Sequence, residues 1–194
     1  MLPDPSTTPD LPQSFFADCR VLSSRLELLK AISSGGVAGE IGVADGDYSA
    51  EILRLNKPAK LHLIDAWAGE RYSSGINRVQ SRFAQQISVE SVILHRGCSV
   101  DILPKLKRKS FDWFYLDASH EYADTTRELR LCAGLVKDGG RISGHDFCPG
   151  SPYTGSIYGV IQAVYEFCSE YGWGFEYITL DGDGHFSFCL KENK

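Results

Sequence analysis

Residues 37–55 read VAGEIGVADGDYSAEILRL and pass from an apolar run through a glycine-rich turn into a segment with helical periodicity. The pattern predicts a strand over 37–42 and a helix over 47–55. Gly42 and Gly46 bound the turn, and glycine lets the backbone adopt a positive φ and approach a ligand closely. The helix that follows offers free N–H groups to an anion. The stretch therefore predicts a strand–turn–helix unit with a ligand at the turn, and a tight turn without a ligand is the alternative.

The alternation of strands and helices continues toward the C-terminus. Apolar runs predict strands at 61–65, 91–95, 111–117 and 141–147, separated by helical patterns over 73–87, 99–106 and 122–136. The run FDWFYLD at 111–117 shows no polar alternation, which is typical of a strand buried on both faces. The predicted fold class is therefore α/β, a mostly parallel sheet with helices on both faces.

Both ends of the chain depart from this alternation. Near the N-terminus, apolar residues at steps of three and four predict one amphipathic helix from Leu11 to the turn at 33–36. These residues are Phe15, Cys19, Leu22, Leu26 and Leu29. Near the C-terminus, a helix over 158–171 precedes two β-rich runs, 175–180 and 185–191. Asp-Gly-Asp-Gly at 181–184 joins the two runs and predicts a hairpin with an antiparallel edge strand, because a calcium loop would need further ligands.

Length and composition favour one domain. The chain has 194 residues, so residues 1–10 are expected to be a flexible arm and 11–194 a single domain. A hydrophobic fraction of 43% and a charged fraction of 23% are typical of a soluble globular protein and exclude a wholly disordered chain. Folding should bury roughly 70% of the surface, so no disulfide or structural metal is needed. The six cysteines include no C-x-x-C pair and are expected to be small core residues.

Charge and hydropathy exclude several partners. The chain has 20 basic and 25 acidic residues, a net charge of −5, which disfavours nucleic acid as a partner. No apolar run approaches the ~18 residues that span a bilayer, so no membrane association is expected. The N-terminus, MLPDPSTTPDLP, has acids and prolines where a signal peptide needs basic and then apolar residues. A cytoplasmic protein is therefore expected.

Ligands of doubly wound sheets bind at the carboxyl ends of the strands, where this chain carries several polar residues. Asp65 closes the second predicted strand about 20 residues after Gly46, the spacing of an acid that grips ribose hydroxyls. A surface helix cap is the alternative for Asp65. Cys98 and Ser99 follow the third strand, where a small polar residue can meet a purine edge or simply cap a helix. The turn at 42–46 has G-x-x-x-G spacing, unlike the G-x-G-x-x-G of dinucleotide folds.

Two further segments combine carboxylates with histidines. Asp117 and His120 follow the most hydrophobic strand, and His145 and Asp146 lie at the end of the next. Adjacent parallel strands should bring the two aspartates together, as a site for Mg²⁺ or as support for a histidine general base. The alternative is that each histidine is a hydrogen-bonded structural residue. His62, His95 and His185 fall within predicted strands, where the structural role is favoured.

The motifs together resemble a known family. E-I-G-V-A-D-G at 40–46, Asp65, D-A-S-H-E-Y at 117–122, the Gly139-Gly140 turn and G-H-D-F at 144–147 occur in this order. Over residues 36–170 they resemble class I methyltransferases that depend on S-adenosylmethionine (SAM). More narrowly, they are similar to methyltransferase domain 24, whose relatives include macrocin-type sugar O-methyltransferases and cephalosporin-hydroxylase-like proteins.

The resemblance implies a fold and a cofactor site. The fold would be a Rossmann-like, doubly wound sheet of seven strands, mostly parallel with one antiparallel edge strand. Glu40, Gly42 and Gly46 would pack against the methionine part of SAM, and Asp65 would hold the ribose, with Ala66 beside it as a further cofactor contact. The remaining implied cofactor contacts are Cys98 and Ser99 at the adenine and Asp117 near the reacting centre.

The resemblance also implies a catalytic centre with two open alternatives. Some relatives bind Mg²⁺ through the strand-end acid and an acid pair after the next strand, but here that pair reads His145-Asp146. Asp117, His145 and Asp146 are therefore the candidate metal ligands. His120 and His145 are the candidate bases, with Asp146 as a third catalytic residue.

The resulting hypothesis is SAM-dependent O-methylation of a small hydroxylated metabolite, with a sugar as one candidate. An NAD(P)-dependent oxidoreductase, a non-catalytic partner module and a metal-dependent hydroxylase are the alternatives, and the G-x-x-x-G spacing disfavours the first. Aromatic and basic residues that could line the acceptor pocket are Trp67, Arg71, Tyr72, Tyr153 and Tyr158. Because little of the chain is left for acceptor recognition, we expect an open site or one completed by a second subunit of a homodimer.

Overall fold

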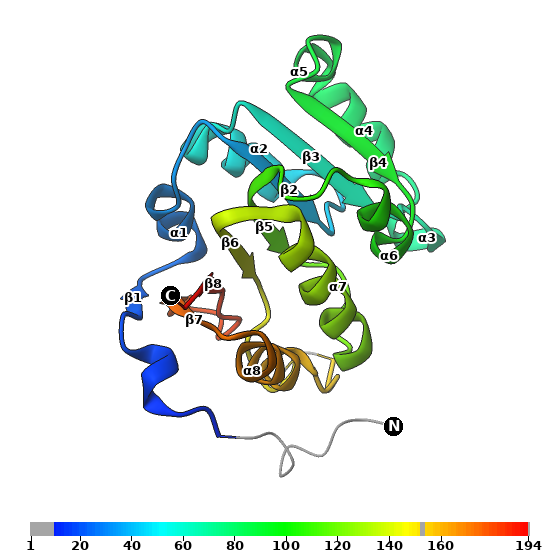
Figure 1. Cartoon of the computed structure of the whole chain (residues 1–194). Helices are drawn as coiled ribbons and strands as arrows, with labels where there is room; N and C mark the ends of the chain where they lie inside the picture. Colours follow the sequence, from blue (N-terminus) through cyan, green and yellow to red (C-terminus); the bar gives the residue numbers. More distant parts are fainter. Residues whose placement is uncertain (1–9, 152–153, 194) are drawn as a thin grey trace.

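The computed structural model describes residues 10–151 and 154–193 (Figure 1). Tyr153 and most of the expected N-terminal arm lie outside these residues. Within them, eight strands form one sheet in the order β1-β7-β8-β6-β5-β2-β3-β4. The strands are β1 Arg20–Leu22, β2 Val37–Ile41, β3 Lys60–Asp65, β4 Val92–Arg96, β5 Phe111–Leu116, β6 Val136–Gly144, β7 Trp173–Thr179 and β8 Phe188–Glu192.

The fold class predicted from the sequence is confirmed, with two differences in the sheet. The sheet has eight strands where seven were expected, because β1 pairs in parallel with β7 and forms the edge. The antiparallel strand β8 is not at the edge but lies between β6 and β7, antiparallel to both. A short strand added to the open edge of β7 supplies hydrogen-bond partners that an exposed strand would lack.

The predicted N-terminal helix is wrong. Its apolar stripe is divided among the 3₁₀ turn η2 Gln13–Phe16, strand β1 and helix α1 Arg25–Ala31. Helix α1 begins anew because the Ser24 side chain caps it, accepting a hydrogen bond from the backbone N–H of Glu27 at 3.4 Å. Apolar residues spaced at three and four fit a helix, but the spacing could not show that Arg20–Leu22 would find a strand partner more than 150 residues away.

Helices cover both faces of the sheet, as the alternating pattern predicted. One face packs against α6 Ser99–Ile102, η4 Leu103–Lys105, α7 Tyr122–Leu135 and α8 Val160–Tyr171. The other packs against α1, the π-helical turn η3 Ile52–Asn56 and α4 Gly75–Arg82. The remaining helices are α2 Asp47–Glu51, α3 Gly69–Tyr72 and α5 Ala84–Ser88. Figure 1 shows α7 and α8 side by side, and α7 packs against β5 and β6 whereas α8 packs against β7.

The strand order places a ligand crevice between β2 and β5. From β2 the chain proceeds outward through β3 and β4, whereas β5 and β6 lie on the opposite side of β2. The crevice outside the carboxyl ends of two strands at such a reversal is where doubly wound sheets bind ligands. The residues after β2, β3 and β5 are therefore the ones that matter for function. Among the described residues, none of the helices is both long and apolar enough to cross a membrane.

Candidate active site

A cavity of about 790 Å³ opens at the carboxyl ends of β2, β3 and β5. This volume lies within the range of small-molecule and cofactor sites. Nearly all the cofactor residues expected from the sequence line it, namely Glu40, Gly42, Asp65, Ala66, Cys98, Ser99 and Asp117. Gly46 does not line the cavity. It precedes α2 with φ of +81°, and a Cβ there would meet Val79 and Phe83.

Gly42 makes the floor of the cavity possible. Its φ is +88°, and a Cβ on it would lie 2.1 Å from the backbone oxygen of Asp117. Its N–H donates to the backbone oxygen of Ile64 at 2.9 Å. Only glycine fits here without moving the neighbouring strand end, because it accepts a positive φ and adds no Cβ.

Asp65 organises the glycine-rich turn. One carboxylate oxygen accepts from the backbone N–H groups of Val43 at 2.8 Å and Ala44 at 2.9 Å. The other accepts from the N–H of Trp67 at 2.6 Å. A carboxylate has about four acceptor positions, so capacity for a hydroxyl of a ligand remains on a group already held in place. The sequence predicted the ligand role of Asp65, but it did not predict this bracing of the turn.

Glu40 is a buried carboxyl at the same end of the cavity. Its side chain is 1% exposed and accepts a 2.5 Å hydrogen bond from the Ser49 hydroxyl. Burial raises the pKa of Glu40 to about 8, and the Ser49 hydrogen bond offsets only part of that rise. Because little offsets the cost of burying the Glu40 carboxyl, it is suited to meet a cationic group of a ligand.

Replacing Glu40 should alter how the stability of the unliganded protein depends on pH. Because the folded pKa of about 8 exceeds the ordinary glutamate pKa of 4.5, wild type loses stability as pH rises from about 4.5 to about 8. Glu40→Gln cannot ionise, so it should be about 5 kcal/mol more stable than wild type at pH 9 and equal to it near pH 4. Urea unfolding at both pH values measures this, with the exposed Glu70→Gln as control. A pH-independent difference would contradict the prediction.

Arg25 and Tyr48 at the cavity were not predicted from the sequence. The Arg25 guanidinium lies 4.8 Å from the centroid of the Tyr48 ring, and its Nη1 is 3.5 Å from Asp117 Oδ2. Both Arg25 and Tyr48 line the cavity. Arg25 begins α1, and its place in the site depends on how that helix packs against the sheet, so no local pattern could indicate it.

The opposite end of the cavity holds a second buried carboxyl. Glu128 of α7 is 2% exposed and accepts a 2.6 Å hydrogen bond from the Ser99 hydroxyl. Burial raises its pKa to about 7, against the opposing effect of the Ser99 hydrogen bond. Cys98 beside it is exposed. Ser99 was predicted from the sequence but Glu128 was not, because Glu128 lies at an ordinary position within the helical pattern of α7.

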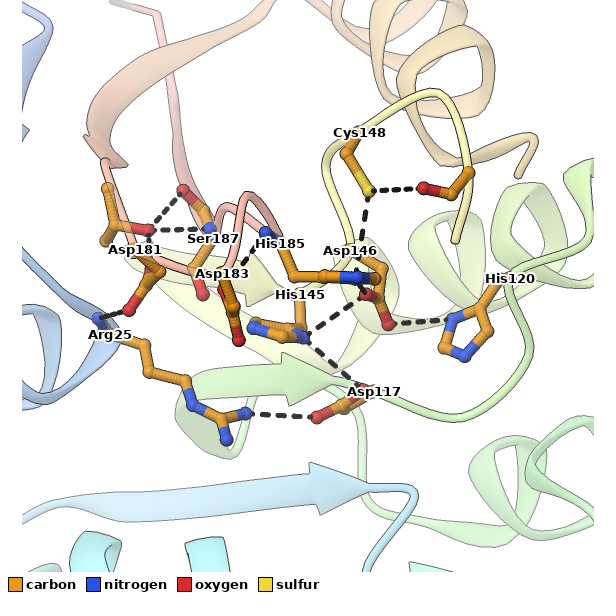
Figure 2. A network of polar contacts seen from close by, with 12 residues as sticks. Arg25, Asp117, His120, His145, Asp146, Cys148, Asp181, Asp183, His185 and Ser187 are labelled. Atoms are coloured by element: carbon orange, nitrogen blue, oxygen red, sulfur yellow. Dashed lines mark hydrogen bonds and ion pairs between the residues drawn. The ribbon is translucent and has the colours of Figure 1, made fainter. Parts of the chain in front are cut away.

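Beyond Asp117, three histidines surround Asp146 (Figure 2). His120 Nδ1 lies 3.1 Å from Asp146 Oδ2, whereas His185 Nδ1 lies 2.5 Å and His145 Nδ1 3.5 Å from Asp146 Oδ1. His145 Nδ1 is also 3.9 Å from Asp117 Oδ1. Asp117 and Asp146 therefore lie at one edge of the sheet, as expected, with imidazoles between them.

Asp146 is held as an anion in a constrained backbone. Burial would raise its pKa, but hydrogen bonds from His145 and His185 and the charge of His120 lower it to about 2. Its φ is +54°, unusual for a residue other than glycine, and such conformations cluster at functional sites. Burial raises the pKa of Asp117, and Asp146 adds to that rise, while His145 and Arg25 oppose it.

His185 corrects one prediction. The sequence predicts a structural histidine inside a strand, but β8 begins at Phe188 and His185 lies in the loop after β7. That loop brings it against Asp146. His62 and His95 do lie in strands, where their rings stack and His62 Nδ1 is 2.9 Å from His95 Nε2.

The residues expected to bind Mg²⁺ lie near one another, since His145 Nδ1 is within 4 Å of both Asp117 and Asp146. His120 joins them, because one ligand atom each of Asp117, His120 and Asp146 lies within 4.8 Å of the other two. The Arg25 guanidinium already lies beside the Asp117 carboxylate. Mg²⁺ prefers oxygen ligands in octahedral geometry, and two carboxylates crowded by imidazoles and a guanidinium do not fit it well.

The expected acceptor residues divide into two groups. Arg71 and Tyr72 line the cavity, and the Tyr158 ring lies 4.5 Å from the His120 ring. Trp67 is fully buried and donates from Nε1 to the backbone oxygen of Ala44, so it supports the turn. Among the cysteines, Cys132, Cys148, Cys168 and Cys189 are buried as expected, whereas Cys19 is half-buried and Cys98 is exposed.

Comparison with known structures identifies the fold. The structure is similar to a type 11 methyltransferase from Sulfolobus solfataricus, with a TM-score of 0.65, 20% identity, and coverage of 89% of this chain and 94% of that one. It is also similar to the O-methyltransferase from Bacillus cereus in complex with SAH, S-adenosylhomocysteine (TM-score 0.63, 17% identity, 96% and 84% coverage). A third similar structure is the pyocyanin biosynthetic protein PhzM (TM-score 0.61, 13% identity). The match covers 82% of this chain but only 51%, about half, of PhzM.

At these identities the structural likeness shows the fold alone, and a tRNA methyltransferase of Bacillus subtilis shares it. No curated protein matches the chain in sequence. Residues 40–147, more than half of the chain, match the family described as methyltransferase domain, Methyltransf_24. This range runs from Glu40 through the Asp117 segment to the Gly-His-Asp-Phe motif. The chain therefore belongs to the methyltransferase domain family and is a class I SAM-dependent methyltransferase.

Proposed function

We propose that this enzyme methylates an oxygen of a small hydroxylated molecule and that His120 is the base. The observation that carries the proposal is the pairing of His120 Nδ1 with Asp146 Oδ2 at 3.1 Å, at the end of the cavity beyond Asp117. An imidazole held through one nitrogen by a buried carboxylate presents its other nitrogen as a base.

The residues around the cavity fit SAM. Glu40 would meet the ammonium group of the methionine part, Asp65 the ribose hydroxyls, and Ser99 the adenine. Two observations support this fit. Little offsets the cost of burying the Glu40 carboxyl, and the turn at Gly42 leaves no room for a Cβ. When bound, SAM supplies a methyl group already activated on a sulfonium sulfur.

The protein has to position the acceptor and take up its proton. His120 accepts the hydroxyl proton at Nε2, while Asp146 Oδ2 accepts the hydrogen bond from Nδ1 and stabilises the imidazolium that forms. Tyr158 packs against the His120 ring and restrains it. His145 is 10% exposed and does not line the large cavity, which favours His120 over His145 as the base.

A small acceptor is favoured over nucleic acid. The chain carries a net charge of −5, and the cavity lining includes Asp117, Asp124 and further carboxylates, which outnumber its two arginines, Arg25 and Arg71. A phosphate backbone binds to surfaces rich in Lys and Arg. A neutral polyol or phenol meets no repulsion from these carboxylates.

Calorimetry and a methyl-transfer panel test the proposal. SAM and SAH should bind with one site per chain, and NADH should not bind. Radiolabelled methyl transfer is then measured to sugars and phenols and, in parallel, to tRNA. Absence of SAM binding at millimolar concentration would overturn the cofactor assignment, and transfer to tRNA alone would overturn the acceptor class.

A further inference from the structure

The proposed reaction leaves one side of Asp146 unused. Its Oδ2 faces His120, but its Oδ1 faces His185 Nδ1 at 2.5 Å, with His145 Nδ1 farther away at 3.5 Å. The Cys148 thiol lies 3.8 Å from the same nitrogen of His185 (Figure 2). One donor atom each of Asp146, Cys148 and His185 lies within 4.8 Å of the other two.

These three donors are withdrawn from solvent. The side chains of Asp146 and His185 are 8% and 14% exposed, and Cys148 is 6% exposed. They come from two separate segments, the turn that follows β6 and the loop between β7 and β8. A carboxylate, an imidazole and a thiol gathered from segments that are distant in sequence form a built donor set, unlike an exposed acidic cluster.

The chemistry of the set selects a class of cation. Thiolate and imidazole ligands suit borderline-soft divalent metals such as Zn²⁺, whereas Mg²⁺ favours oxygen ligands. With Zn–S bonds of ~2.3 Å and Zn–N bonds of ~2.1 Å, tetrahedral sulfur and nitrogen ligands stand ~3.6 Å apart. The distance between Cys148 Sγ and His185 Nδ1, 3.8 Å, is close to this spacing.

We propose that Asp146, Cys148 and His185 bind one divalent transition metal of the zinc type. The fourth position is left to solvent, as in zinc sites with three protein ligands. The metal replaces the hydrogen bond between His185 and Asp146, whose 2.5 Å separation must open to the ~3.4 Å of ligands sharing one zinc ion. This site differs from the Asp117, His145 and Asp146 set expected from the sequence.

The site would couple a loop to the base. The Asp146 carboxylate would bind the metal through Oδ1 and accept a hydrogen bond from His120 Nδ1 through Oδ2. Carboxylates that bind metals are commonly hydrogen-bonded in this way to a supporting residue. The metal would also fasten the loop that carries His185 to the end of β6. Cys148 otherwise contacts only the backbone oxygen of Gly150, at 3.6 Å, and the His185 ring among the described hydrogen bonds.

Cobalt spectroscopy tests the proposal without any need for an acceptor or SAM. Chelator-treated protein is titrated with Co²⁺, and we expect one equivalent to bind with a near-ultraviolet thiolate-to-cobalt charge-transfer band. Cys148→Ser should lose the band, whereas the control Cys19→Ser, outside the cluster, should keep it. His185→Gln should weaken Co²⁺ binding at least ~10-fold.

Each outcome of the cobalt titration either supports or overturns the proposed metal site. Absence of binding, or a charge-transfer band that survives in Cys148→Ser, overturns the proposal. If Cys148→Ser does not fold by circular dichroism, His185→Gln decides, and unchanged Co²⁺ affinity in that variant overturns the site. Equimolar zinc in protein purified without added metal, reduced in His185→Gln, supports it. Mg²⁺ should not displace the bound Co²⁺.

Discussion

Asp65→Ala should weaken SAM binding by about 100-fold or more. The carboxylate is proposed to accept hydrogen bonds from the ribose hydroxyls, and charged hydrogen bonds contribute about 1.5–3 kcal/mol each. The same substitution leaves the N–H groups of Val43, Ala44 and Trp67 without their acceptor, which loosens the cofactor turn. Isothermal titration calorimetry with SAM and SAH measures the loss, since about 3 kcal/mol corresponds to roughly 100-fold in affinity.

Two comparisons separate the ribose contact from the support of the turn. Asp65→Asn retains one acceptor oxygen, so it should lower the SAM affinity strongly and the melting temperature only slightly. Asp101→Ala removes an exposed acid outside the cavity and should leave both unchanged. An Asp65→Ala protein that binds SAM within threefold of wild type would remove Asp65 from the cofactor site.

His120→Ala should lower kcat by about 10²–10⁴-fold, the usual contribution of a general base. The loss follows from the pairing of His120 with Asp146, since an alanine leaves the acceptor hydroxyl without a base. SAM affinity should stay within a few-fold, because His120 lies beyond the cofactor end of the cavity. Initial rates with an acceptor identified in the panel measure the effect.

The shape of the pH profile distinguishes a base from a structural residue. Wild type should show a fall in kcat at acidic pH that His120→Ala lacks, and added imidazole should restore part of the rate. Asp146→Asn should also lower kcat, because it removes the charge that stabilises the imidazolium. A kcat for His120→Ala within threefold of wild type, at every pH, would exclude the base role.

Local patterns predicted the central part of the fold well. The strand, turn and helix of residues 37–55 were confirmed as β2, the Gly42–Gly46 turn and α2 with η3. The sheet class followed because apolar runs and helical stripes alternate, and each signal spans only one element. The N-terminal helix was wrong for the same reason: the stripe at Phe15–Leu29 is local, whereas the pairing of β1 with β7 is not.

The sequence also located residues without showing how they are used. Asp65 was selected by its distance from Gly46, but its three backbone hydrogen bonds depend on the shape of the turn. Glu128 and Arg25 were missed because nothing in α7 or α1 marks them until the helices are placed against the cavity. The cavity is a property of neighbouring strand ends and has no local signature.

By itself, the sequence determined the fold class, the family and the strand ends where the ligand residues lie, because periodicity and motif spacing are short-range properties. Only the tertiary structure decided the environment of Asp146. His185, 39 residues later in the chain, reaches it through the β7–β8 loop, and His120 reaches it from the end of β5. Such contacts depend on the packing of separate segments. Only the folded protein therefore shows that one oxygen of Asp146 faces His120 and the other faces His185 of the Cys148–His185 pair.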